Sequence, residues 1–455
     1  MISPGPVDTG AVGDRDASGS LGAPQPTLGV GEAVAITVGI VIGAGIFRTP
    51  SLVASAAANE QALIGAWVAG GLISLVGALC YAELASAYPH AGGDYHYLTK
   101  AYGRKLGFLY AWARLTVIQT GSAVLLAFVA GDYLSRLLDL GRYSADLYAA
   151  LIVALLTGLN WAGIRQGTRA QNWLTAIEII GLVTIIAVGL TLAPAAKPSI
   201  SAARSTDFGL IMVFVLLTYG GWSEAAYISA ELRNARRRMA HVLAGSLVLV
   251  TLLYVLANLA YLRSLGLAGM ARSNAVAADL MAGTLGAPGV VMISALVAVS
   301  ALTSANATMI TGARSAYALG CDYSRFARLG RWDGRTGTPR AAMLVQGGAA
   351  LLLVGLGSLT RDGFRTALEY TAPIFWLFFL LVGLSLFVLR TREPEIARPF
   401  RVPLYPLLPM IFCLSSLYLL YASLAYTGVG AFAGVGVMGV GGILLMLPER
   451  QPAQQ

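Results

Sequence analysis

The chain alternates between long apolar runs and short polar loops. Apolar runs long enough to cross a membrane occupy roughly residues 31–57, 62–88, 106–138, 146–163, 171–193, 208–230, 240–264, 287–317, 341–359, 366–390, 404–425 and 428–447. Each run is near or above the roughly 17 to 25 residues that a spanning helix needs. The pattern predicts an all-α, polytopic membrane protein with about 12 transmembrane helices.

Composition agrees with this pattern. Hydrophobic residues make up 57% of the 455 residues and charged residues only 12%, whereas about 25% of a soluble domain is charged. Residues 1–27 are rich in Gly, Pro, Ser, Asp and Thr, and we expect them to form a disordered cytoplasmic tail. The transmembrane domain is expected to occupy residues 28–448.

The basic residues predict the orientation. If the N-terminus lies inside, the inner loops carry more than twice as many Lys and Arg residues as the outer loops. Because positive loops stay in the cytoplasm, both termini are expected there, with the protein integral to the plasma (cytoplasmic) membrane. The net charge of +9 is therefore no sign of a nucleic-acid partner. The three cysteines have no metal-site spacing, so neither a metal nor a cofactor is expected.

Glycines interrupt the first apolar run near mid-membrane depth, where residues 39–47 read GIVIGAGIF. Gly43 and Gly45 weaken a helix, and unwinding there would free backbone N–H groups at the start of a second half-helix. That positive dipole end suits a carboxylate. Alternatively, Gly39 and Gly43 form a close-packing face between helices, which leaves Gly45 unexplained.

The sixth apolar run has a comparable break, TYGGWSE at residues 218–224. Carbonyls freed at Leu217 and Gly220 could accept hydrogen bonds from a substrate ammonium. Tyr219 or Trp222 could close over the ligand as a gate, although an aromatic residue beside a helix break often only packs. Two broken helices in corresponding halves of a membrane protein indicate a transporter binding site.

The positions of the breaks also predict the architecture. Breaks in spans 1 and 6 fit a five-plus-five inverted repeat, with a first repeat at about 31–193, a second at about 208–390 and two extra helices at about 404–447. A six-plus-six arrangement would pair span 1 with span 7, which has no comparable break.

A charged residue within an apolar run needs a partner. Glu178 lies deep in the fifth run, where an acid costs about 2.5–3.5 kcal/mol and must face protein or water. It could exchange a proton, sit beside a cation or only bond to neighbouring side chains. Glu224 either lines the cavity or its inner mouth, or faces water. We interpret Glu83 and Arg114, nearer the ends of their runs, as members of a local ion pair.

Several stretches resemble the amino acid–polyamine–organocation (APC) transporters, and within them the L-type amino acid permeases. These stretches are residues 42–47 (IGAGIF), residues 81–84 (YAEL) with Pro89 and residues 92–95 (GGDY), residues 219–222 (YGGW), the loop residues Glu231, Asn234 and Arg237, and residues 398–406 (RPFRVPLYP). The resemblance runs from about residue 28 across almost the whole chain.

The resemblance implies a secondary transporter for amino acids. The α-carboxylate would bind helix 1 amides, the α-amine would bind carbonyls at both breaks, and the side-chain pocket would draw on helix 6 and on Phe375 and Trp376 of helix 10. The implied substrate-binding residues are Val41, Ile42, Gly43, Ala44, Gly45, Ile46, Leu217, Tyr219, Gly220, Trp222 and Ser223.

Three residues concern the family's coupling and selectivity. Many sodium-independent members have a Lys in helix 5, but this chain has Glu178 there, which favours proton coupling. The L-type Asn after the Trp is Ser223 here, which leaves the size of the substrate open. Some exchangers of cationic substrates carry an acid in helix 6, so Glu224 keeps arginine or polyamines open. Glu178 and Glu224 are therefore the coupling candidates.

Together these observations predict a secondary active transporter and not an enzyme. The expected substrate is a neutral L-amino acid, moved by alternating access through proton symport or exchange. The alternative is a cationic amino acid or polyamine exchanger. A channel would need a filter-like repeat, which the sequence lacks. An intramembrane enzyme would need convergent catalytic side chains, yet all three histidines fall in expected loops. The oligomeric state and any accessory subunit remain open.

Overall fold

The computed structural model describes residues 30–90, 92–163, 168–196, 206–224, 235–360, 362–425 and 428–446. These residues form helices and no strand. The expected tail at residues 1–27 and the loop residues Glu231 and Asn234 lie outside the described residues, as does the side chain of Arg237.

The helices follow the expected runs closely. In chain order they are α1 (Val30–Val41), the 3₁₀ helix η1 (Ala44–Phe47), α2 (Thr49–Ala56), α3 (Glu60–Ala87), α4 (Gly93–Tyr102), α5 (Arg104–Ala113), the π-helical turn η2 (Arg114–Ile118), α6 (Gln119–Leu134), α7 (Ser144–Trp161), α8 (Thr168–Thr191), α9 (Phe208–Thr218), α10 (Ala235–Arg272), α11 (Val276–Asp322), the 3₁₀ helix η4 (Ser324–Phe326), α12 (Arg340–Thr360), α13 (Gly363–Arg392), α14 (Leu407–Ala425) and α15 (Val429–Met446).

Nine helices within the described ranges are long and apolar enough to cross a membrane. Shorter apolar stretches in α8 and α9, and the interrupted series α1, η1 and α2, lie in three further expected runs. The prediction of an all-helical polytopic membrane protein is therefore confirmed.

Helices α10 and α11 run past the ends of their expected spans, and each of them bends at a glycine there. Gly266 in α10 and Gly286 in α11 both have a φ of 65°, a backbone conformation that residues other than glycine rarely adopt. The expected spans 240–264 and 287–317 end and begin beside these glycines, so the extra turns of each helix form a separate segment beyond the bend.

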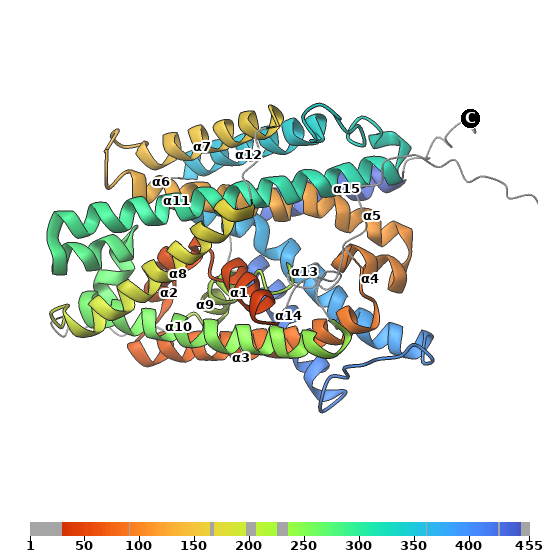
Figure 1. Cartoon of the computed structure of the whole chain (residues 1–455), viewed down its shortest axis with the longest axis horizontal. Coiled ribbons are helices and arrows are strands. Elements are labelled where there is room, and N and C mark those ends of the chain that lie inside the picture. The colour runs from red at the N-terminus through yellow and green to blue at the C-terminus, as the bar shows by residue number, and fades with distance from the viewer. Residues whose placement is uncertain are drawn as a thin grey trace, which may run out of the picture.

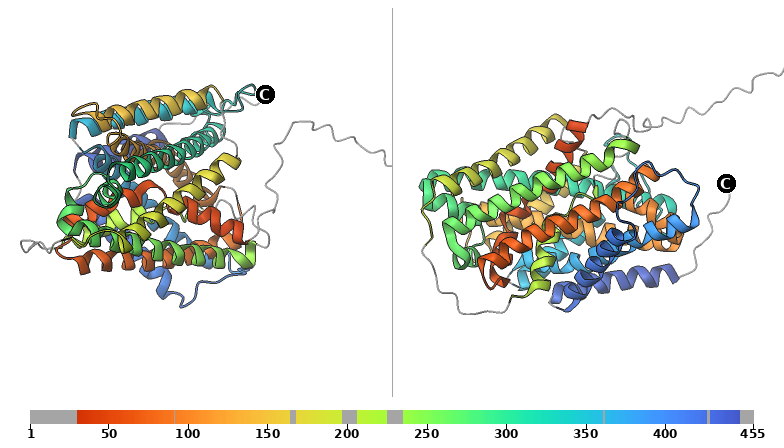
Figure 2. Two further views of the ribbon diagram at one scale, coloured as in Figure 1. Left: turned by 60° about the vertical axis from the view of Figure 1, so that its left-hand side comes forward. Right: turned by 90° about the horizontal axis from the view of Figure 1, so that it is seen from below.

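The spans are arranged around the broken helices. Figure 1 shows α7 and α12 together along one edge of the bundle and α3 with α10 along the opposite edge, with α1 and α9 between them. The left view of Figure 2 shows the same pairs side by side. Ile42 and Ala44 at the first break and Tyr219 and Trp222 at the second are buried, so both breaks lie inside the protein.

The packing has an internal symmetry. Span 2 packs on span 7 (α3 on α10), span 3 on span 8 (α6 on α11) and span 4 on span 9 (α7 on α12). The contact of span 5 with span 8 (α8 on α11) has its counterpart in that of span 10 with span 3 (α13 on α6). If every span is replaced by its equivalent five places away, each of these contacts becomes itself or another contact in the set. A five-plus-five repeat requires this. The residue boundaries of the two repeats remain predictions.

The outer faces of the bundle are apolar. Large hydrophobic side chains are exposed on many helices, among them Leu72, Leu155, Val248, Leu352 and Leu414. A soluble protein rarely exposes so much contiguous apolar surface, and hydrocarbon is the environment that suits it.

Candidate functional site

The first predicted break is present in the structure. Helix α1 ends at Val41, and the chain turns through Gly43 (φ −8°, ψ 164°) into η1. Because hydrogen bonds in a 3₁₀ helix reach back three residues, its first three N–H groups, at Ala44, Gly45 and Ile46, have no partner within the helix. These are the amides that the sequence assigns to a carboxylate.

The second predicted break is also present. Helix α9 ends at Thr218, and Gly221 follows with a φ of 94°, which explains why glycine stands there. The N–H of Gly220 donates to Leu217 O over 3.1 Å. The described residues of this span end at Glu224, and the second half of the expected span lies outside them.

The two breaks meet in space. A Cβ atom built on Gly45 would lie 3.3 Å from Thr218 Cγ2. The hydroxyl of Tyr254, on α10, is 2.8 Å from Val41 O and 3.3 Å from Thr218 O. A single side chain therefore bridges the last carbonyls of both half-helices. Tyr254 could not be identified from the sequence, because its partner groups are backbone atoms far away along the chain.

The two aromatic residues at the second break pack against other helices. The Tyr219 hydroxyl donates to Trp67 O over 2.9 Å. The Trp222 ring lies 5.0 Å from that of Tyr81 and 5.3 Å from that of Phe379. Both residues at the break are buried. In this conformation they hold the break against α3, α10 and α13, and a role as gates stays a prediction.

A cavity lies beside the second break. Its space is about 270 Å³, counting the part open to solvent. The residues that line it are Asp94, Tyr110, Arg114, Ile118, Ser223, Glu224, Phe375, Phe378 and Phe379. Phe375 also comes within 3.8 Å of a Cβ atom built on Gly220, so this ring lies beside both the cavity and the break. Ser223, Glu224 and Phe375 line the cavity, whereas Trp376 does not. The use of this cavity as a side-chain pocket stays a prediction.

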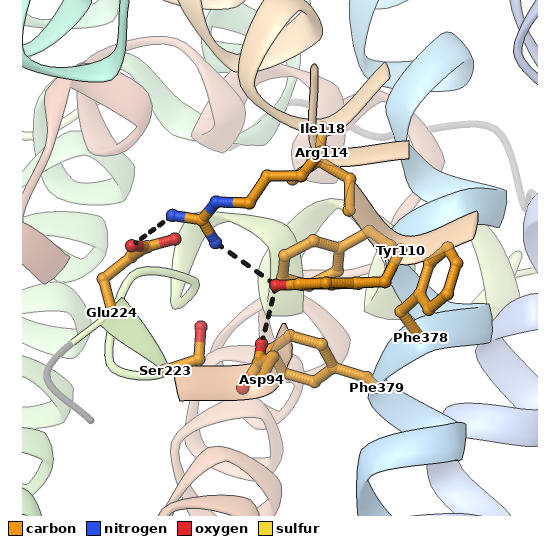
Figure 3. A pocket seen from close by; sticks show the side chains of 9 residues that line it. Asp94, Tyr110, Arg114, Ile118, Ser223, Glu224, Phe378 and Phe379 are labelled. Carbon is orange, nitrogen blue, oxygen red and sulfur yellow. Dashed lines mark hydrogen bonds and ion pairs between the residues drawn. The ribbon is translucent and has the colours of Figure 1, made fainter. Parts of the chain in front are cut away.

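Four polar side chains form a chain of hydrogen bonds along the cavity wall (Figure 3). Arg114 Nη2 donates to Glu224 Oε2 over 2.9 Å, and Arg114 Nη1 donates to the Tyr110 hydroxyl over 3.2 Å. The Tyr110 hydroxyl donates to Asp94 Oδ2 over 3.1 Å. The chain connects the second break to α4, α5 and η2. Arg114 begins the π-helical turn η2, and such turns occur frequently at functional sites.

Asp94 is the buried end of this chain. It lies on α4, outside the spanning segments, and its burial raises the pKa of its carboxyl group to about 7. The Arg114 guanidinium opposes this rise and the Glu224 carboxylate adds to it, while hydrogen bonds from Tyr110 and Tyr81 favour the ionised form. Asp94 therefore changes its charge near neutral pH.

Glu83 and Arg114 each form an ion pair, but with residues far away in the sequence. Glu83 accepts a hydrogen bond from Arg390 Nε over 2.7 Å, and Arg398 Nε lies 3.7 Å from it. The N–H of Val402 donates to the same carboxylate over 2.7 Å. Glu83 thus anchors the segment before α14 to α3 and α13, whereas Arg114 belongs to the cavity.

The two coupling candidates lie in different surroundings. Glu224 lines the cavity and is paired with Arg114. Glu178 is only 4% exposed on α8, beside Ser300 of α11. Its Oε1 atom has no hydrogen-bond partner among the described residues, and Glu178 is not among the residues that line the cavity.

A second buried ion pair lies beyond the first break. Arg48, between η1 and α2, donates to Asp132 Oδ2 of α6 over 3.1 Å and lies 3.8 Å from Asp362 at the start of α13. Its guanidinium also donates to Ser51 Oγ over 2.6 Å. Arg48 is 6% exposed and was not among the residues predicted to be functional. An arginine inside an apolar run needs such partners, which is the signal that could have identified it.

The model of the amino acid permease family matches residues 28–447. The chain belongs to this family. Its members are transporters, which agrees with the expectation that the chain is not an enzyme. This permease is 30% identical to the mouse protein "Large neutral amino acids transporter small subunit 2" over 447 residues, which cover 95% of this chain and 82% of the relative.

Two human relatives give similar alignments. The human "Large neutral amino acids transporter small subunit 2" is 30% identical over 448 residues, covering 94% of this permease and 82% of the relative. The human "b(0,+)-type amino acid transporter 1" is 29% identical over 409 residues, covering 88% and 82% respectively. The similarity to amino acid transporters of the L-type branch therefore extends through both breaks and the cavity.

Proposed function

We propose that this permease moves neutral L-amino acids across the cytoplasmic membrane by alternating access, through proton symport or exchange. The observation that carries the proposal is the meeting of the two helix breaks, where Gly45 lies against Thr218. Backbone amides at the first break and carbonyls with a free lone pair at both breaks match the carboxylate and ammonium that amino acids carry. Two relatives have names that refer to large neutral amino acids, which supports the same substrate class.

The two ends of the amino acid would bind different backbone groups at the breaks. The carboxylate would accept hydrogen bonds from the η1 amides, where the helix dipole also favours a negative charge. The ammonium would donate to carbonyls at both breaks. Gly220 O accepts no backbone hydrogen bond within the described part of the chain, and Val41 O keeps one lone pair beyond its bond to Tyr254.

The charge of the cavity favours a neutral side chain. Glu224 supports the alternative, a cationic amino acid or polyamine exchanger, because an acid could hold a cationic side chain. However, Arg114 already pairs with this carboxylate over 2.9 Å. If basic substrates compete for uptake and Glu224→Gln leaves that competition unchanged, Glu224 plays no part in holding them.

Alternating access requires the broken helices to move against their neighbours. Arg48 ties the first broken span to α6, and Glu224 ties the second to η2 through Arg114. Both ion pairs end on span 3, and they lie near its opposite ends. In the proposed cycle, the broken spans 1 and 6 move against a scaffold of spans 3, 4, 8 and 9, and the two ion pairs open in turn.

We further propose that both termini lie in the cytoplasm and that Glu178 carries the coupled proton. The excess of basic residues in one set of loops supports the orientation. The burial of Glu178 supports the coupling role, as does its Oε1 atom, which has no hydrogen-bond partner among the described residues. An acid inside a spanning segment is costly and commonly marks a proton pathway.

Uptake by purified protein in proteoliposomes tests the proposal. Labelled neutral, basic and acidic amino acids would be compared with and without an inward proton gradient. Saturable uptake of neutral amino acids that rises with the gradient supports symport, and uptake that depends on internal amino acid supports exchange. Saturable uptake of basic substrates alone would establish the alternative, and absence of any amino acid uptake would refute both.

A further inference from the structure

The cavity beside the second break contains opposite charges that offset one another. Arg114 is 6% exposed, and its guanidinium lies between the Glu224 carboxylate and the Tyr110 hydroxyl. Gln119 Nε2 also lies 3.5 Å from Glu224 Oε1. In such a poorly solvated place each charge acts more strongly than it does in water. The balance between these groups therefore sets the electrostatic potential that a substrate side chain meets.

We propose that Arg114 determines the charge selectivity of this permease by neutralising Glu224. The inference rests on the proposed function, because it takes the cavity as the place where the substrate side chain lies. With the pair intact, Glu224 is not available to a cationic side chain. Without the guanidinium, the same carboxylate becomes a site for the ammonium of lysine or the guanidinium of arginine.

Among the described residues that line the cavity, Arg114 is the only cation. The charged residues lining the cavity are Arg114, Glu224 and Asp94. The remaining lining residues are apolar or uncharged polar side chains. Arg114 Nε donates to Ser315 Oγ of α11 over 3.0 Å, which holds the guanidinium plane in place but brings no charge. Burial raises the pKa of Asp94 to about 7, so below that pH this carboxyl group is mostly uncharged. In that state, losing Arg114 turns a balanced cavity into an acidic one, and losing Glu224 turns it into a basic one.

The test compares two inhibitors in the same variant, so that a change in the overall rate of uptake does not hide a change in selectivity. Inhibition of labelled leucine uptake by lysine is compared with inhibition by norleucine, which lacks the side-chain amine. We expect Arg114→Gln to shift this ratio toward lysine by about tenfold or more, as one unbalanced charge in a partly buried site would. The double variant Arg114→Gln with Glu224→Gln should return the ratio to that of the unmodified protein.

The single variant Glu224→Gln should act in the opposite direction. It leaves the Arg114 charge unbalanced, so inhibition by glutamate relative to glutamine should increase. This arm also keeps the inference testable if Arg114→Gln is not produced in folded form. For variants that bind without transporting, thermal stabilisation of the purified protein by each amino acid gives the same ratios.

Two controls separate local from general effects. Arg114→Lys keeps the charge and should keep the original selectivity. Arg104→Gln removes an equal charge from an exposed position outside the cavity and should change neither ratio. If leucine uptake is present and Arg114→Gln leaves the lysine-to-norleucine ratio unchanged, the inference is wrong while the proposed function stands. If the unmodified protein takes up no amino acid, the proposed function itself fails.

Discussion

The Tyr254 hydroxyl donates a hydrogen bond to the Val41 carbonyl over 2.8 Å. Val41 is the last residue of α1, so this bond satisfies a carbonyl that the broken helix leaves without an intrahelical partner. The same hydroxyl lies 3.3 Å from Thr218 O at the end of α9. One side chain thus links the ends of the two half-helices that are proposed to hold the substrate.

Tyr254→Phe should destabilise the protein and impair transport. The buried Val41 carbonyl would lose its partner, which costs about 1–3 kcal/mol, and the two breaks would no longer be held together. Thermal unfolding in detergent and leucine uptake in proteoliposomes measure the two effects.

Tyr261→Phe is the matched control for this substitution. Tyr261 lies on the same helix, is fully buried, and its hydroxyl has no hydrogen-bond partner among the described residues. Its removal should therefore cost little. Equal losses in the two variants would show that the Tyr254 hydroxyl has no special role at the breaks.

Asp94→Asn should change how stability depends on pH. Burial raises the pKa of Asp94 from 3.8 to about 7, so between these values the folded protein holds a proton that the unfolded chain has released. Stability contributed by this group therefore falls as the pH rises through that window. The asparagine variant lacks this fall. Its stability relative to the unmodified protein should increase from pH 4 to pH 7 and level off above. A difference that is the same at every pH would contradict this assignment.

Glu178→Gln should flatten the pH dependence of uptake while permitting exchange between labelled and unlabelled amino acid. The reason is that the amide cannot release or take up a proton at this buried position. Uptake would be measured across a range of external pH at saturating substrate. Ser300→Ala removes the hydroxyl group beside Glu178 and leaves the carboxyl group in place, so this variant should keep the original pH dependence of uptake. An unchanged profile in Glu178→Gln would make the residue a structural acid.

The sequence predicted the helices and their breaks because both are local properties. Apolar runs of sufficient length specify spans, and the glycines at residues 43 and 45 and at residues 220 and 221 mark where a helix is weakest. The long helices α10 and α11 also bend at glycines, yet these bends lie at the ends of the expected spans and gave no signal within them.

The cavity could not be predicted in the same way. Arg114 and Glu224 are 110 positions apart, and the sequence alone paired Arg114 with a nearby charge. The available signal was that Arg114 and Glu224 carry charges of opposite sign inside apolar runs, where each charge must find a partner. From the sequence, Asp94 is only one residue of the GGDY stretch at residues 92–95. Its importance comes from burial against α5 and η2, which is a consequence of tertiary packing.

Equilibrium binding of labelled leucine to purified Gly45→Val tests whether the substrate binds where the two breaks meet. The added side chain would begin 3.3 Å from Thr218 Cγ2 and would occupy the meeting point of the two breaks. Gly65→Val adds the same volume where no atom lies within 4 Å of the new Cβ, and it controls for folding. We expect saturable binding to the unmodified protein and to Gly65→Val, and no binding to a folded Gly45→Val. Unchanged leucine affinity in folded Gly45→Val would contradict the placement of the substrate at the two breaks.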